Sequence, residues 1–84
     1  MKYQSIPALS GFELIKILKK DGWIEHRRTT HGIALKKRIE DRTRVTIVPK
    51  TRATLPTGTL MAIMGEKLTG LGRSGLLCLL NRYK

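Results

Sequence analysis

The chain has 84 residues and carries 17 Lys and Arg against 6 Asp and Glu, which gives a formal charge of +11. This length supports one modest hydrophobic core, so we expect a single domain over residues 1–84. A lone cysteine excludes an internal disulfide and favours a cytoplasmic location, and no apolar run approaches the roughly 20 residues of a membrane span. The composition indicates a small basic protein with a polyanionic partner, nucleic acid first among them.

A capped helix is predicted over about residues 10–21. Ser10 is a suitable N-cap, and Glu13 follows three residues later, which together form a capping box. An apolar stripe at helical spacing comes next, and Gly22 is placed to end the helix in a left-handed conformation.

The middle third of the chain has the pattern of an antiparallel meander. Strands are expected at about residues 23–29, 33–39 and 44–48, joined by turns at Thr30-His31-Gly32 and Glu40-Asp41-Arg42. Apolar residues recur at every second position, which is typical of strands with one buried face.

Side-chain alternation predicts which residues share a face of this sheet. Ile33 and Leu35 are expected to point into the core, together with Val45 and Ile47. The opposite, open face is then expected to carry Lys36, Arg38, Arg44 and Thr46. Nine of the 17 basic residues lie between residues 21 and 52, so the sheet should be the electropositive part of the molecule.

Two further helices are predicted after the sheet. Thr57 is the expected cap of the first and Ser74 the expected cap of the second. The resulting order, α-β-β-β-α-α, predicts an α+β fold in which the helices pack on one face of a three-stranded antiparallel sheet.

Two histidines are the residues with the most promising chemistry. No spacing of Cys and His favours a metal site, and no cofactor is expected. His26 falls within a strand, whereas His31 lies in a turn close to Arg27, Arg28 and Lys36. An imidazole near cations that hold a phosphate suits general acid–base catalysis on RNA, and a structural turn histidine is the alternative.

Five stretches, in their order and spacing, resemble the HicA toxins, the mRNA interferases of HicA–HicB toxin–antitoxin pairs. They are Ser10–Leu18, Lys20–Trp23, Arg28–Gly32, Arg44–Pro49 and Leu55–Leu60. The resemblance implies a fold related to the double-stranded RNA-binding domain, and it places the functional histidine of the family at His31. Thr29-Thr30 stands where the family has Gly-Ser, so Thr30 still supplies a hydroxyl.

The resemblance implies an endoribonuclease that cleaves mRNA without a metal ion, with His31 as general acid or base. The residues expected to bind RNA are Arg27, Arg28, Thr30, Lys36, Arg38 and Arg44. An acidic HicB-like antitoxin is the implied protein partner, covering His31 and the basic face. Three alternatives stay open: a non-catalytic RNA- or DNA-binding module such as a ribosome-associated protein, a toxin that has lost its activity, and a helix–turn–helix built from the last two helices.

Overall fold

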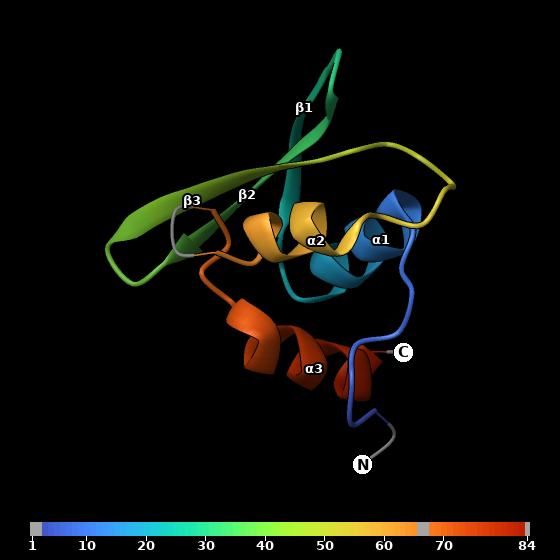
Figure 1. Ribbon diagram of the computed structural model, residues 1–84. Helices are drawn as coiled ribbons and strands as arrows, with labels where there is room; N and C mark the ends of the chain where they lie inside the picture. Colours follow the sequence, from blue (N-terminus) through green and yellow to red (C-terminus); the bar gives the residue numbers. More distant parts are fainter. Residues whose placement is uncertain (1–2, 66–67, 84) are drawn as a thin grey trace.

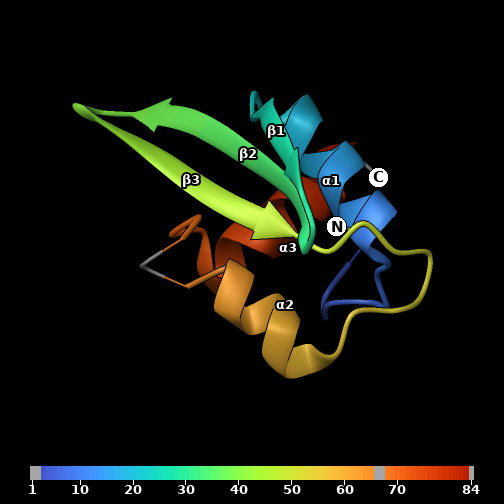
Figure 2. The same cartoon turned by 90° about the horizontal axis from the view of Figure 1, so that it is seen from above.

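A computed structural model describes residues 3–65 and 68–83. Its elements are α1 (Gly11–Lys20), β1 (Ile24–Thr29), β2 (Gly32–Ile39), β3 (Arg42–Val48), α2 (Thr57–Ile63) and α3 (Gly72–Tyr83). The strands form one antiparallel sheet in the order β1-β2-β3. All three helices lie on the same side of it, where α1 and α2 contact β3 and α3 packs against α1 (Figures 1 and 2). The predicted α+β architecture and element order are confirmed.

Both ends of α1 are specified by local sequence. The Ser10 hydroxyl accepts from the Glu13 N–H at 3.2 Å, and the Glu13 carboxylate accepts from the Ser10 N–H at 3.0 Å, which confirms the capping box. Gly22 adopts a φ of 101°, and the Trp23 N–H donates to the Leu18 carbonyl at 3.0 Å, closing a Schellman motif. The helix therefore ends within one residue of the predicted limits.

Both hairpin turns contain two residues rather than three. Thr29 pairs with Gly32 across the first turn, and Ile39 pairs with Arg42 across the second. Because partner positions across the second turn differ by an odd number, each odd residue of β2 faces an even residue of β3. The predicted three-residue turn would have paired odd with odd, and a shift of one residue moves every side chain of a strand to the other face.

The face predicted for β3 is therefore wrong. Thr46 and Val48 point toward the helices and are buried, whereas Val45 and Ile47 are 43% and 42% exposed on the open side. Arg44 belongs with Thr46 on the helix side, opposite Lys37 of β2. The β2 assignment holds, because Ile33 and Leu35 are buried in the core.

One hydrophobic core lies between the sheet and the helices. Its fully buried members include Leu14 and Leu18 of α1, Leu35 of β2, and Leu76 and Leu80 of α3. In a chain this short, burial of these side chains supplies most of the stabilising free energy.

The predicted cap is wrong by one residue for α2 and by three residues for α3. Pro56 occupies the N-cap position of α2 without a side-chain hydrogen bond, and Thr57 is the first helical residue. Ser74 lies inside α3, which begins at Gly72.

Candidate functional site

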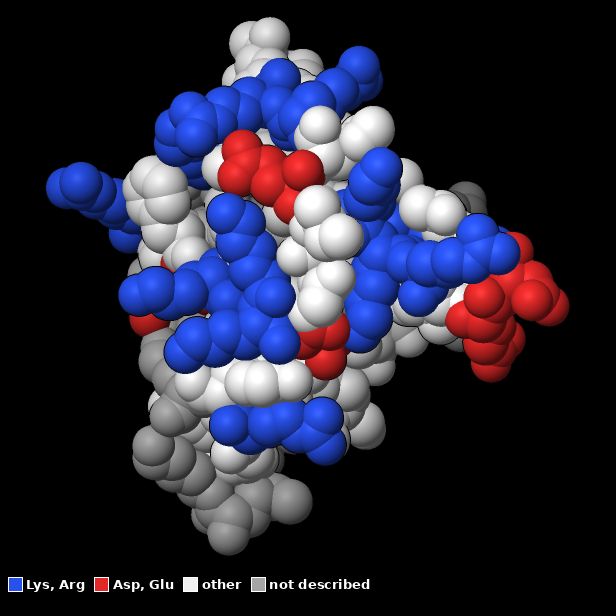
Figure 3. Space-filling view, turned by 180° about the vertical axis from the view of Figure 1, so that it is seen from behind, with Lys and Arg blue, Asp and Glu red and all other residues white. Residues whose placement is uncertain are grey.

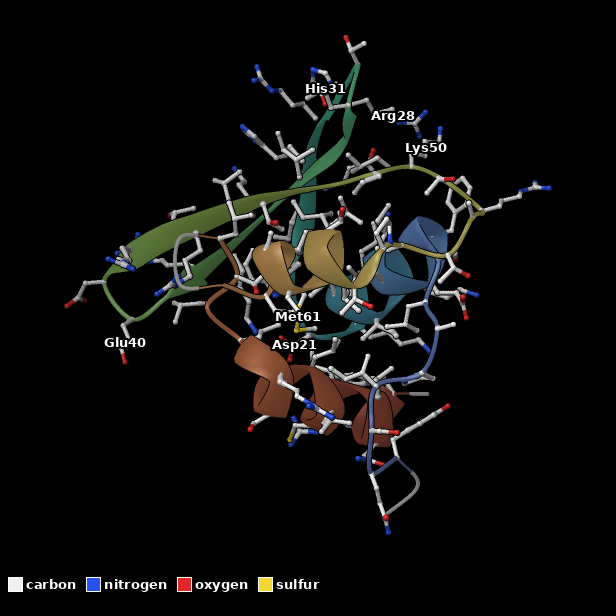
Figure 4. The ribbon with its side chains drawn as sticks, viewed as in Figure 1. Asp21, Arg28, His31, Glu40, Lys50 and Met61 are labelled. Carbon is white, nitrogen blue, oxygen red and sulfur yellow. The ribbon has the colours of Figure 1, made fainter. Side chains whose placement is uncertain are left out.

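His31 is exposed at the tip of the β1–β2 hairpin, at the end of the molecule farthest from α3 (Figure 4). Thr29 orders this turn, since its hydroxyl accepts from the His31 N–H at 3.2 Å and donates to the Gly32 carbonyl at 3.0 Å. The hydroxyl that holds the turn thus belongs to Thr29, while Thr30 is exposed beside the histidine. A backbone fixed by its own side chains presents the imidazole to solvent in a defined place.

Gly32 brings the hairpin against the end of β3. Its φ is 148°, and a Cβ atom there would collide with the Val48 carbonyl oxygen and lie 2.9 Å from the Pro49 Cα. Only glycine allows the two backbones to approach this closely. Lys50 follows Pro49 directly, so this contact places Lys50 at the same end of the molecule as Arg28 and His31 (Figure 4). The predicted set of RNA-binding residues omits Lys50, and no sequence signal identifies it.

Arg28 is held by an ion pair on the helix side of β1. Its Nε lies 3.2 Å from Glu25 Oε1, while Lys19 Nζ of α1 lies 3.2 Å from Glu25 Oε2. The hydrogen bond from Arg28, followed by that from Lys19, holds the pKa of the Glu25 carboxyl below its usual 4.5. The Arg28 side chain is 70% exposed, so this bond orients the guanidinium without covering it.

The predicted cations of the open sheet face are partly confirmed. By register, Arg27 shares that face with Ala34 and Ile47, and Lys36 and Arg38 lie farther along β2. Figure 3 views the molecule from behind, and on that side Lys and Arg form several patches. An acidic cluster lies at one side, where the β2–β3 turn carries Glu40 and Asp41.

Arg44 is not among these cations, which corrects its predicted position. It is half-buried on the helix side and donates from Nη1 to the Leu68 carbonyl at 3.2 Å. Lys37 behaves in the same way: its Nζ donates to the Asp21 carbonyl at 2.6 Å and to the Asp21 carboxylate at 3.0 Å. Both side chains stabilise the fold, because they satisfy carbonyl groups of the helical layer.

The second histidine lies away from the first. The β1–β2 register slips between Glu25 and Arg27, so His26 occupies a β-bulge in the middle of the strand. His26 lies three positions before Thr29, the last residue of β1, which is on the order of 10 Å at strand spacing. The structure therefore does not bring His26 and His31 together at one phosphate.

Metal sites, membrane-spanning helices and surface hollows are the other features of the described residues that bear on function. Within residues 3–65 and 68–83, no group of three or more His, Cys, Asp or Glu side chains is arranged to hold a metal ion. In the same residues, no helix is both long enough and apolar enough to cross a membrane. Two surface hollows, one between the N-terminal arm and α2 and one between α1 and Tyr83, are not lined by His31.

Comparison with known proteins adds one finding. Residues 11–71 match the model of a family described as the HicA toxin of bacterial toxin–antitoxin systems. The matched span runs from the first residue of α1 to the residue before α3, and it contains the sheet and His31. No curated protein and no solved structure matches the chain.

Proposed function

The chain belongs to the HicA toxin family of bacterial toxin–antitoxin systems, and from that premise we propose that it is a cytoplasmic endoribonuclease that cleaves mRNA. The observation that carries this proposal is the exposed His31, held in a turn ordered by Thr29 and flanked by cations. An imidazole can accept a proton at one ring nitrogen and donate one from the other, which suits general acid–base catalysis.

The proposed reaction is an internal transesterification. The 2′-hydroxyl oxygen of the RNA attacks the adjacent phosphorus, the bond from phosphorus to the 5′-oxygen breaks, and a cyclic phosphate and a 5′-hydroxyl result. His31 takes the proton from the nucleophile or gives one to the leaving oxygen. Because the nucleophile is part of the substrate, this chemistry needs no metal ion. Arg28 and Lys50 stabilise the negative charge that develops on the phosphate oxygens.

The remaining exposed cations extend the proposed RNA path. Thr30 offers a hydroxyl next to His31, and Arg27, Lys36 and Arg38 continue along the open sheet face as phosphate contacts. Arg44 is left out of this path, because its side chain is directed to the helix side. The partner proposed for the toxin is an acidic HicB-like antitoxin, whose encounter with a chain of charge +11 would be accelerated electrostatically.

Replacement of the two histidines tests the mechanism. Purified protein is incubated with mRNA in EDTA, and His31→Ala is compared with His26→Ala as a matched exposed control on the same hairpin. We expect His31→Ala to cleave about 10²–10⁴-fold more slowly while it still binds RNA, because it removes general acid–base catalysis alone. The free energy of unfolding should change by about 0.5 kcal/mol or less in both variants.

Three outcomes would contradict the proposal. Cleavage that requires a divalent ion excludes the metal-free mechanism. Full activity of His31→Ala excludes the histidine. Parent protein that binds RNA without cleaving it indicates a non-catalytic binding module or an inactive toxin.

A further inference from the structure

The open sheet face exposes large apolar side chains as well as cations. Ile24 is 62% exposed, and Val45 and Ile47 are 43% and 42% exposed, on the side of the sheet opposite α1, α2 and α3. Single exposed apolar residues are common on protein surfaces, whereas several on one sheet face need an explanation.

The strand register fixes how these side chains are arranged. Two neighbouring rows cross the sheet from β1 to β3, namely Arg27, Ala34 and Ile47, and next to them Ile24, Lys36 and Val45. A third row, on β2 and β3 alone, holds Arg38 and Thr43. Each row contains one cation, and the β3 end of the first two rows is aliphatic. The open sheet face, defined here as these eight residues, thus carries an aliphatic strip, Val45 and Ile47 on β3, beside three positive charges on β1 and β2.

RNA binding explains the cations of the open sheet face but not its aliphatic side chains. Phosphates pair with the cations, but aliphatic side chains provide neither a flat ring for a base to stack on nor a hydrogen bond to a base edge. Protein interfaces, in contrast, combine an apolar centre with a polar rim, and opposite charges across the rim select the partner. A protein surface with apolar side chains bordered by carboxylates complements both halves of the open sheet face.

We propose that the open sheet face docks an acidic protein partner, with Val45 and Ile47 at the centre of the contact and Arg27, Lys36 and Arg38 paired to its carboxylates. The inference rests on the proposed function, in which this partner is the antitoxin. It separates two roles on one face: the cations serve RNA and the antitoxin alike, and the aliphatic strip serves the antitoxin alone. A bound antitoxin therefore denies RNA its contacts at Lys36 and Arg38, in addition to any cover that it gives His31.

The double variant Val45→Thr/Ile47→Thr tests the aliphatic strip. Threonine keeps a β-branched side chain that suits a strand, while it removes methyl groups from the exposed surface. The probes are a purified acidic HicB-like antitoxin, the partner in the proposed function, and a short RNA. We expect about a tenfold or greater loss of antitoxin affinity with RNA cleavage unchanged. Phe12→Ala is the matched control, since Phe12 is 39% exposed on α1, and it should change neither readout.

A charge reversal tests the cations independently of the strip and guards against a misfolded double variant. Arg38→Glu and Lys16→Glu change the net charge equally, but Lys16 is exposed on α1 away from the sheet. We expect Arg38→Glu to slow association with the antitoxin by about tenfold more than Lys16→Glu at low salt.

The outcomes separate this inference from the proposed function. If the parent protein binds the antitoxin and the variants Val45→Thr/Ile47→Thr and Arg38→Glu bind it equally well, the contact lies elsewhere and the proposed function stays intact. A double variant that loses RNA binding and keeps the antitoxin makes the strip a nucleic-acid surface. Parent protein that binds no such partner overturns the toxin–antitoxin assignment of the proposed function along with the docking site.

Discussion

Lys36 and Lys37 are neighbours in the sequence, yet they lie on opposite faces of β2 in different surroundings. Lys37 reaches back to the end of α1, where it donates to the carbonyl and the carboxylate of Asp21. Lys36 lies on the open sheet face between Ile24 and Val45. One lysine stabilises the fold, and the other is available to a partner. Charge in a basic protein is therefore not evidence of binding until the face of each strand is known.

Arg44 and Arg38 repeat the contrast between the faces. The Arg44 guanidinium bonds the Leu68 carbonyl in the connection between α2 and α3, while Arg38 is exposed on the open sheet face. Both residues lie on strands in the same basic segment, and the number of residues in the β2–β3 turn decides which of them is structural.

The largest expected effect is on the free energy of unfolding, and it tests the contrast between Lys37 and Lys36. Lys37→Ala removes a charged donor from two acceptors at Asp21, whose side chain is only 14% exposed, and should lower the free energy of unfolding by about 2 kcal/mol. Lys36→Ala should change it by about 0.5 kcal/mol or less. Urea unfolding of the two variants measures the difference. Equal losses of stability in Lys37→Ala and Lys36→Ala would mean that the two lysines do not differ in their structural role.

The next effect concerns RNA affinity and its dependence on salt. Lys36→Ala/Arg38→Ala removes two proposed phosphate contacts, which should weaken binding by about tenfold and reduce the slope of log affinity against log salt by about 1.4. Arg44→Ala is the matched control and should leave the slope unchanged while it lowers stability. Binding to single-stranded RNA across a salt series measures both quantities. A slope that changes only with Arg44→Ala would move the RNA path to the helix side.

The smallest expected effect is a change in stability on β3, and it compares the helix side of that strand with its open face. Thr46 is 1% exposed, and its hydroxyl has no hydrogen-bond partner among the described residues. Thr46→Val replaces that hydroxyl by a methyl group of similar size and should raise the free energy of unfolding by about 1 kcal/mol. Thr43→Val, on the open sheet face, should change it by about 0.5 kcal/mol or less. Thermal unfolding detects the difference, and destabilisation by Thr46→Val would show that the hydroxyl is satisfied.

Local signals predicted the first half of the fold well. The Ser10–Glu13 capping box and the left-handed Gly22 set both ends of α1, because each depends only on residues within one turn of the helix. The strands were found within two residues of their limits, since side-chain alternation is also a local property. The turn that carries His31 was predicted as well, although its hydroxyl ligand is Thr29 rather than Thr30.

Predictions that depended on pairing were less secure. The face of β3 was reversed, because a turn of two residues and a turn of three differ little in sequence but shift the register by one. Lys50 was missed because it reaches the His31 end only through the contact of Gly32 with Val48 and Pro49, which are distant in the sequence.

The sequence by itself determined the element order, the capped first helix, the basic character of the sheet and the resemblance that the family match over residues 11–71 confirms. These features follow from residue spacing and composition. Only the tertiary structure decided which cations stabilise the fold and which face solvent, why Val45 and Ile47 lie outside the core, and which residues accompany His31. Each of these depends on strand register and on backbone contacts between distant segments, and their free energies are set by packing that local sequence does not encode.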